Sequence, residues 1–184
     1  MLRNAVELWL AFFAAILITG LYGLVMVLTR EIPPAGELFG HGMGIFGFLL
    51  MLMTETLYSI RKRMRTVRFG RMALWLRFHI FTGLVGPYMV LLHTSWKFNG
   101  LAGVTTLLTV VIVISGFVGR YIYTRIPRTA DGIVIEGSLS AEALKHTRRL
   151  MALWHTVHIP IGMALFTAAF VHIGAALYYA TFLK

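Results

Sequence analysis

The chain has 184 residues, of which 58% are hydrophobic and 13% are charged, and its mean hydropathy is +0.78. Soluble domains are about 45–50% apolar and about 25% charged, so this composition excludes an ordinary soluble domain and predicts a membrane protein. The net charge is +10 and there are no cysteines, which excludes disulfides, iron–sulfur ligation and thiolate-bound haem from this chain.

Five segments are apolar and long enough to cross a bilayer as helices, which takes about 20 residues. In chain order they are about 6–29, 41–60, 73–96, 101–124 and 150–181. The first is longer than a signal-peptide core and lacks a small-residue cleavage site, so we expect it to be retained. In the long connection 126–149, residues 131–137 are predicted to form a short hairpin or extended piece. Ser140 is predicted to cap a helix that starts at Ala141.

The basic residues are distributed unequally between the two sides of these spans. Fourteen of the 17 lie at the N-terminus or flank the second–third and fourth–fifth connections, and only Arg30, Lys97 and Lys184 lie on the other side. The positive-inside rule therefore predicts a cytoplasmic N-terminus and an outside C-terminus, in the inner membrane if the cell is bacterial. Membrane lipids are the expected partners of the basic loops, and no nucleic-acid motif accompanies them.

Four histidines form two matched pairs in the third and fifth spans. His79 and His93 are 14 residues apart, and so are His158 and His172. Fourteen residues make almost four helical turns, so each pair lies on one face of its helix, about 21 Å apart. The third and fifth spans run in the same direction, which would bring His79 level with His158 and His93 level with His172.

The two histidine segments also repeat each other in sequence. Residues 72–93 and 151–172 both read M-A-L-W-x-x-x-H-I-x-x-G, followed by nine residues and a histidine, at a constant offset of 79. This identity indicates an internal repeat. Gly83 and Gly162 come one turn after the first histidine of each copy, where a missing side chain would let a planar ring approach the backbone. A run of glycines in the second span predicts close helix packing: Gly40, Gly42, Gly44 and Gly47.

Two level histidines on facing helices suit a flat macrocycle with one axial ligand on each face, so we expect two b-type haems. A compact zinc or copper site needs three or four ligands, which neither level provides. The alternative is that the histidines bond other helices as interior polar groups. The expected fold is all-α, a single transmembrane domain of five helices, four of which form a haem-binding bundle.

Other residues are predicted to serve the haems or a quinone. Arg77, Arg120 and Arg125 are candidates for the haem propionates, with snorkelling to lipid phosphate as the competing interpretation. Trp75 and Trp154, each four residues before a histidine, would pack on a haem or lie in an aromatic belt. His155 is expected to hydrogen-bond a haem propionate or a quinone, and His41 to contact the outer haem or a quinone head group. An interfacial position is the alternative for both.

The spacing of His79, His93, His158 and His172 resembles the di-haem cytochrome b superfamily, over roughly residues 40–182. That superfamily includes cytochrome b of the quinol-oxidising bc-type complexes and the ferric-reductase-like transmembrane domains. The resemblance implies two haem b groups between two parallel helices. We expect the electron-transfer subunit of an oxidoreductase complex, working between a peripheral redox subunit and either quinone or a carrier on the opposite face.

Two other functions are left open by the sequence. One is a non-redox helical protein, such as a transporter component or assembly factor. The other is a stand-alone transmembrane ferric or quinone reductase. The chain carries no nucleotide-binding motif and no flavin or nicotinamide domain, which is why a partner subunit is expected, and no residue is assigned a catalytic role.

Overall fold

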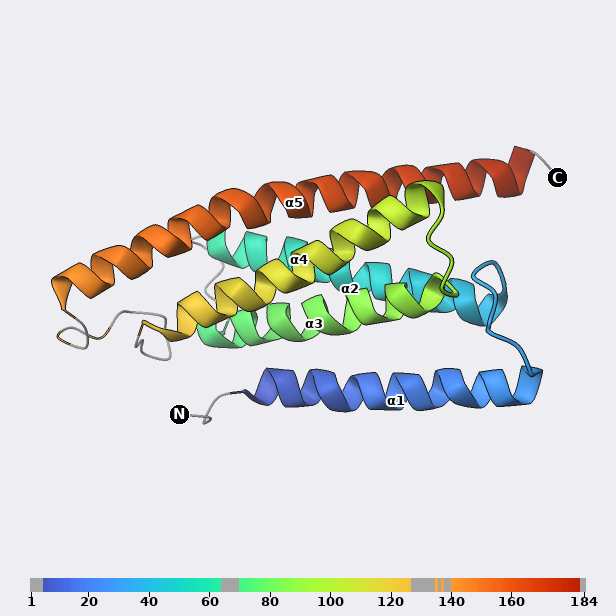
Figure 1. Cartoon of the computed structure of the whole chain (residues 1–184), viewed down its shortest axis with the longest axis horizontal. Helices are drawn as coiled ribbons and strands as arrows, with labels where there is room; N and C mark the ends of the chain where they lie inside the picture. The colour runs from blue at the N-terminus through green and yellow to red at the C-terminus, as the bar shows by residue number, and fades with distance from the viewer. Residues whose placement is uncertain (1–4, 64–69, 127–134, 136, 138–139, 183–184) are drawn as a thin grey trace. The chain divides into compact units, whose positions relative to one another are not determined.

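The structure, a computed structural model, describes residues 5–63, 70–126, 135, 137 and 140–182 (Figure 1). All of its regular elements in those residues are α-helices. They are α1 (Val6–Thr29), α2 (Leu38–Arg63), α3 (Met72–His93), α4 (Gly100–Thr124) and α5 (Ala141–Phe182). All five are long and apolar enough to cross a membrane. The prediction of an all-α, multi-pass membrane protein is confirmed.

α2 extends three residues beyond its predicted span at each end, and the ends of two other helices differ from the hydropathy pattern. α3 ends at His93, because Ser95 and Trp96 adopt left-handed φ angles of 48° and 62° that a right-handed helix cannot contain. α5 begins nine residues before the apolar span, where the Ala143 backbone N–H donates to Ser140 Oγ at 3.2 Å. The predicted cap at Ser140 is confirmed, but its helix is continuous with the fifth span. The predicted hairpin at residues 131–137 falls largely outside the described residues.

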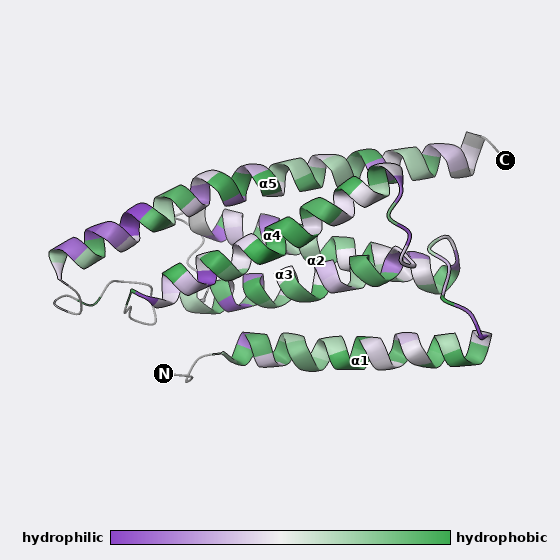
Figure 2. Ribbon diagram, in the orientation of Figure 1, coloured by the Kyte–Doolittle hydropathy of each residue, from purple (hydrophilic) through white to green (hydrophobic). Residues whose placement is uncertain are grey.

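With 42 residues α5 is about 63 Å long, roughly twice the hydrocarbon thickness of a bilayer. Its first turns are hydrophilic and its later turns are apolar (Figure 2). The helix therefore extends beyond the apolar layer at its N-terminal end.

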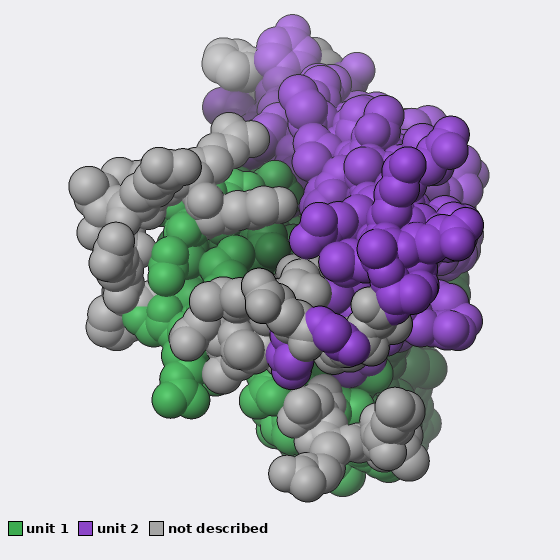
Figure 3. Space-filling model, turned by 90° about the vertical axis from the view of Figure 1, so that its left-hand side faces the viewer, with its two compact units in different colours: residues 1–96, 130–132 green, residues 97–129, 133–184 purple. Residues whose placement is uncertain are grey.

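The chain folds into two compact units, which Figure 3 shows in different colours. The first contains α1, α2 and α3, with α3 packed against both other helices. The second contains α4 and α5, which pack against each other. α3 and α5, which carry the repeated histidine segments, thus belong to different units.

α2 and α3 cross at a pair of glycines. A methyl group built at Gly47 or at Gly86 would lie 2.8 Å from the carbonyl oxygen of the other glycine. Atoms this close require two residues without side chains, so the two backbones touch at this point. The prediction that the glycines of the second span allow close helix packing is confirmed at Gly47.

α1 packs on α3 through an apolar cluster and one ion pair. The cluster contains the buried residues Tyr22 of α1, Met43 of α2 and Leu92 of α3. Near the start of α1 the buried Glu7 carboxylate lies 3.9 Å from the Nε of Arg77 on α3. Many other apolar side chains of α1 are exposed, Leu17 by 76%, as suits a helix that faces lipid.

Candidate metal centre

His79 is held by the backbone of the neighbouring helix α2. Its Nδ1 lies 3.1 Å from the Thr54 carbonyl oxygen. A carbonyl oxygen can only accept, so Nδ1 carries the proton and Nε2 carries the lone pair of the neutral ring. The Thr54 hydroxyl donates to the Thr82 hydroxyl at 2.6 Å, and the Tyr58 ring lies 4.9 Å from the imidazole. These contacts fix the plane of the imidazole and the direction of Nε2.

His93 is held in the same way at the other end of the α2–α3 pair. Its Nδ1 donates to the Gly40 carbonyl oxygen at 2.8 Å. A methyl group built at Gly44, one turn further along α2, would lie 2.8 Å from Cγ and Nδ1 of the imidazole. Gly44 is therefore the space into which the His93 ring fits.

These two hydrogen bonds follow from a single packing register. On α3, His79 and His93 each lie seven residues from Gly86, and on α2, Thr54 and Gly40 each lie seven residues from Gly47. Seven residues are almost two turns, so both histidines return to the helix face that touches α2. The glycine crossing thus places a carbonyl acceptor opposite each histidine.

In the second unit, His158 is held by contacts with α4 and with its own helix. Its Nδ1 lies 3.0 Å from the Ser115 hydroxyl. Trp154, one turn before it, stacks on the imidazole with centroids 4.5 Å apart and donates its indole N–H to the Ser115 carbonyl at 2.7 Å. Gly119 makes room for that indole, because a methyl group there would overlap the ring.

His172 differs from the other three. It is half-buried, and within the described part of the chain its ring has no hydrogen bond. Continued along the antiparallel α4–α5 pair, the register that sets His158 opposite Ser115 would set His172 opposite Leu101, whose side chain has no polar atom. The Leu101 carbonyl accepts from the Thr105 hydroxyl at 2.9 Å.

No group of three or more His, Cys, Asp or Glu side chains that could hold a metal ion is present in either unit, as far as the described residues extend. Each unit instead offers single imidazoles about 21 Å apart along one helix. Comparisons with protein-family models, with curated proteins and with solved structures find no match to this chain. The resemblance to the di-haem cytochromes b therefore rests on the histidine spacing and stays a prediction.

Gly83 and Gly162 lie against the neighbouring helix of their own unit. A methyl group at Gly83 would be 3.4 Å from Thr54 Cγ2, and one at Gly162 would be 3.8 Å from Ile112 Cδ1. Both are ordinary contact distances, so packing within each unit does not require glycine at either position. That these glycines make room for a planar ring stays a prediction.

The three arginines predicted to bind propionates have different surroundings. Arg77 is paired with Glu7, Arg120 is half-buried beside Gly119, and Arg125 is exposed at the end of α4. Arg125 donates to the Tyr121 hydroxyl, and its guanidinium lies 4.5 Å from the centre of the Tyr121 ring. Among the three, Arg77 thus has a carboxylate partner within its own unit, which the sequence did not indicate.

The remaining predicted residues contact either a residue of their own helix or one of the imidazoles. Trp75 packs edge-on against Phe78, with centroids 6.4 Å apart. His155 donates from Nδ1 to the Met151 carbonyl of its own helix at 2.9 Å. The exposed His41 ring is 6.4 Å from the His93 ring. The structure brings His41 beside a candidate ligand, while its role toward haem or quinone stays a prediction.

The sequence did not indicate the residues that orient the imidazoles. Thr54, Gly40 and Ser115 accept or share hydrogen bonds with Nδ1, and Gly44 makes room for His93. A signal existed for the first unit, since Gly40, Gly47 and Thr54 on α2 have the same seven-residue spacing as His79, Gly86 and His93 on α3. For Ser115 no repeat or motif marks its position.

Proposed function

We propose that this chain is a membrane cytochrome b subunit that holds two b-type haems and passes electrons along them. His79 and His158 would hold one haem, and His93 and His172 would hold the other. The exchange partners would be a peripheral redox subunit and either quinone or a carrier on the opposite face. The proposal requires α3 and α5 to meet face to face across the two units.

The observation that carries this proposal is the way the histidines are held. Metal-binding histidines almost always donate their second ring N–H to an acceptor, which fixes the tautomer and orients the ring. His79 and His93 do so toward carbonyl oxygens, and His158 contacts a hydroxyl at the same atom. The 14-residue spacing repeated in α3 and α5 supports haem ligation over a role in joining helices, which would not need two matched pairs.

The donor set also fits haem better than another metal. Each proposed level supplies two imidazole nitrogens, without the three or four ligands that zinc or copper requires. Iron held by two histidines accepts and returns one electron and offers no open position to a substrate.

The residues of the chain would then control the two haem sites separately. The hydrogen bonds at Nδ1 raise the basicity of Nε2 and hold each ring in place. Arg77 and Arg120 would add positive charge to the surroundings of the haems. Different surroundings at the two levels would give the two sites different affinities for an electron.

The test is the haem content of the purified full chain, measured by pyridine haemochrome assay, together with its reduced-minus-oxidised spectrum. We expect two haem b per chain. Alanine at His79 or at His158 should remove the same spectral component, and alanine at His93 or at His172 should remove the other. His146, an exposed histidine before the apolar span, is the matched control, and H146A should keep both haems.

Two outcomes contradict the proposal. A well-folded but colourless chain would leave the histidines as interior hydrogen-bonding groups. Equal loss of both components in every histidine variant, with unchanged helicity by circular dichroism, would contradict the assignment of ligands in level pairs.

A further inference from the structure

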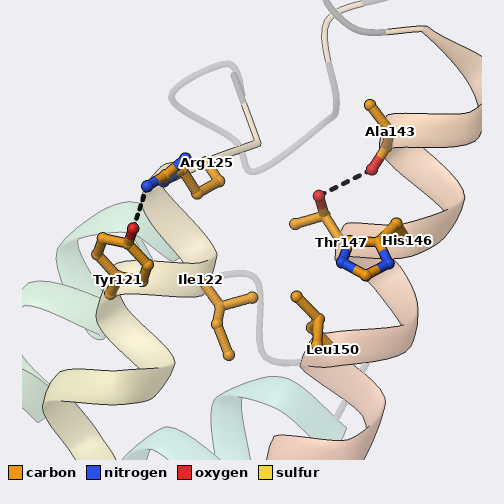
Figure 4. A pocket seen from close by; sticks show the side chains of 7 residues that line it. All are labelled: Tyr121, Ile122, Arg125, Ala143, His146, Thr147 and Leu150. Atoms are coloured by element: carbon orange, nitrogen blue, oxygen red, sulfur yellow. Dashed lines mark hydrogen bonds between the residues drawn. The ribbon is translucent and has the colours of Figure 1, made fainter.

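The second unit contains a half-open cavity of about 330 Å³ between the end of α4 and the start of α5 (Figure 4). A water molecule takes about 30 Å³ in the liquid, so the cavity has room for a phosphate ester. The last turns of α4 and the first three turns of α5 line it, with the residues Tyr121, Ile122, Arg125, Ala143, His146, Thr147 and Leu150.

One end of the cavity is apolar and the other is polar. Ile122 and Leu150 lie toward the apolar part of both helices, where they face each other (Figure 4). Arg125 lies one turn closer to the end of α4, and Thr147 lies one turn closer to the start of α5. The cavity therefore suits a ligand with a polar head and an apolar tail.

The polar end carries a positioned cation. Arg125 donates to the Tyr121 hydroxyl, and its guanidinium lies over the Tyr121 ring, which restrains a side chain that is otherwise flexible. A guanidinium presents several N–H donors in one plane and matches two oxygens of a phosphate at once.

The charge around the cavity has one predominant sign. The exposed residues on the first turns of α5 include three basic ones, Lys145, Arg148 and Arg149. The acidic residue on these turns is Glu142. The cavity also lies where α5 changes from hydrophilic to apolar turns (Figure 2). Lipid phosphates occupy this level of a membrane, and basic pockets between helices there attract anionic head groups.

From these observations we propose that this cavity is a binding site for one anionic phospholipid. The phosphate is bound by Arg125 with help from His146 and Thr147. The Thr147 hydroxyl turns to the phosphate from the Ala143 carbonyl, to which it donates at 2.8 Å. The start of an acyl chain lies between Ile122 and Leu150. None of the four haem-ligand candidates lines the site, and this proposal assigns Arg125 to the lipid phosphate rather than to a haem propionate.

The test uses the full chain, stripped of lipid in detergent and titrated with phosphatidylglycerol or phosphatidylcholine, with bound lipid counted by native mass spectrometry. We expect phosphatidylglycerol to bind at one site and phosphatidylcholine not to bind there. Arg125→Gln should weaken phosphatidylglycerol binding roughly thirty-fold, because it removes charge-assisted hydrogen bonds. Arg148→Gln changes the same charge outside the cavity and should weaken binding by about five-fold or less.

A second variant covers the case in which Arg125→Gln does not fold. Thr147→Val keeps the charge and the volume and should weaken binding by roughly two- to ten-fold. Unchanged binding in Thr147→Val, or equal weakening in Arg125→Gln and Arg148→Gln, would overturn the site in favour of diffuse attraction. Equal binding of phosphatidylcholine would overturn the charge selectivity.

Two further measurements distinguish lipid binding from binding of free phosphate and of a haem propionate. Inorganic phosphate that displaces phosphatidylglycerol at equal concentration would assign the cavity to a free anion and overturn the lipid proposal. Haem content, measured on the same samples, should stay at the wild-type value in Thr147→Val. An Arg125→Gln chain that loses haem and keeps its lipid would overturn the proposal and assign Arg125 to a propionate.

Discussion

Replacing Gly44 with alanine tests how the α2–α3 pair positions His93. The new methyl group would lie 2.8 Å from the imidazole, and the ring must retreat by about 0.6 Å to reach the ordinary contact distance of 3.4 Å. Gly44 and Gly40 lie one turn apart on α2, so this retreat also lengthens the 2.8 Å hydrogen bond from His93 to the Gly40 carbonyl. A lengthening of that size takes the bond beyond the usual hydrogen-bond range.

The expected cost follows from these two changes. Overpacking costs about 1–3 kcal/mol, and a strained hydrogen bond costs up to about 1 kcal/mol more. Alanine is favoured over glycine in a helix by about 1 kcal/mol, which offsets part of the loss. We therefore expect Gly44→Ala to lower the free energy of unfolding by roughly 1–3 kcal/mol, and the affinity of the site at His93 for haem by about 10–100-fold.

Gly42→Ala is the matched control, because a methyl group at Gly42 has no atom within 4 Å. It makes the same chemical change two residues away, on the same helix, and should leave stability equal or slightly higher. The assays are unfolding by sodium dodecyl sulfate in detergent, followed by circular dichroism, and the haem content of each variant. Equal stability of Gly44→Ala and Gly42→Ala would refute the placement of the His93 ring, whether or not haem is bound.

Three other changes test the packing around the remaining histidines and α1. Ser115→Ala should raise the midpoint potential of one haem by roughly 20–60 mV in a redox titration, because it removes the partner of His158 Nδ1. Ser115→Thr should restore the potential, and a shift of both haems, or of neither, would contradict this role. Gly119→Ala should destabilise the chain by about 1–3 kcal/mol, because its methyl group overlaps the Trp154 indole. Gly116→Ala is the control, since its methyl group points into open space, and equal unfolding midpoints of the two variants would be inconsistent with the packing. Arg77→Gln should lower the free energy of unfolding by about 3 kcal/mol, because the Glu7 carboxylate stays buried, whereas Glu7→Gln should lower it by about 1 kcal/mol, since Arg77 is 40% exposed and can reach water. The reverse order in the same detergent unfolding assay would count against the ion pair.

Much of the secondary structure could be predicted because hydropathy and length act locally along the chain. All five spanning helices were predicted, and the described structure has all five. The ends were less accurate, since helix ends depend on backbone conformation and capping rather than on apolar content. The left-handed conformation of Ser95 and the continuous helix after Ser140 are two such cases.

The amino-acid sequence by itself determined which residues are candidates: a 14-residue spacing returns two histidines to one face of any α-helix, whatever surrounds it. Only the tertiary structure decided how those histidines are held. The partners of His79, His93 and His158 are a carbonyl or hydroxyl on a helix that is distant in sequence, and the crossing at Gly47 and Gly86 selects two of them. Carbonyl groups are present in every residue, so no sequence pattern marks the one that will accept; the contact between backbones determines it.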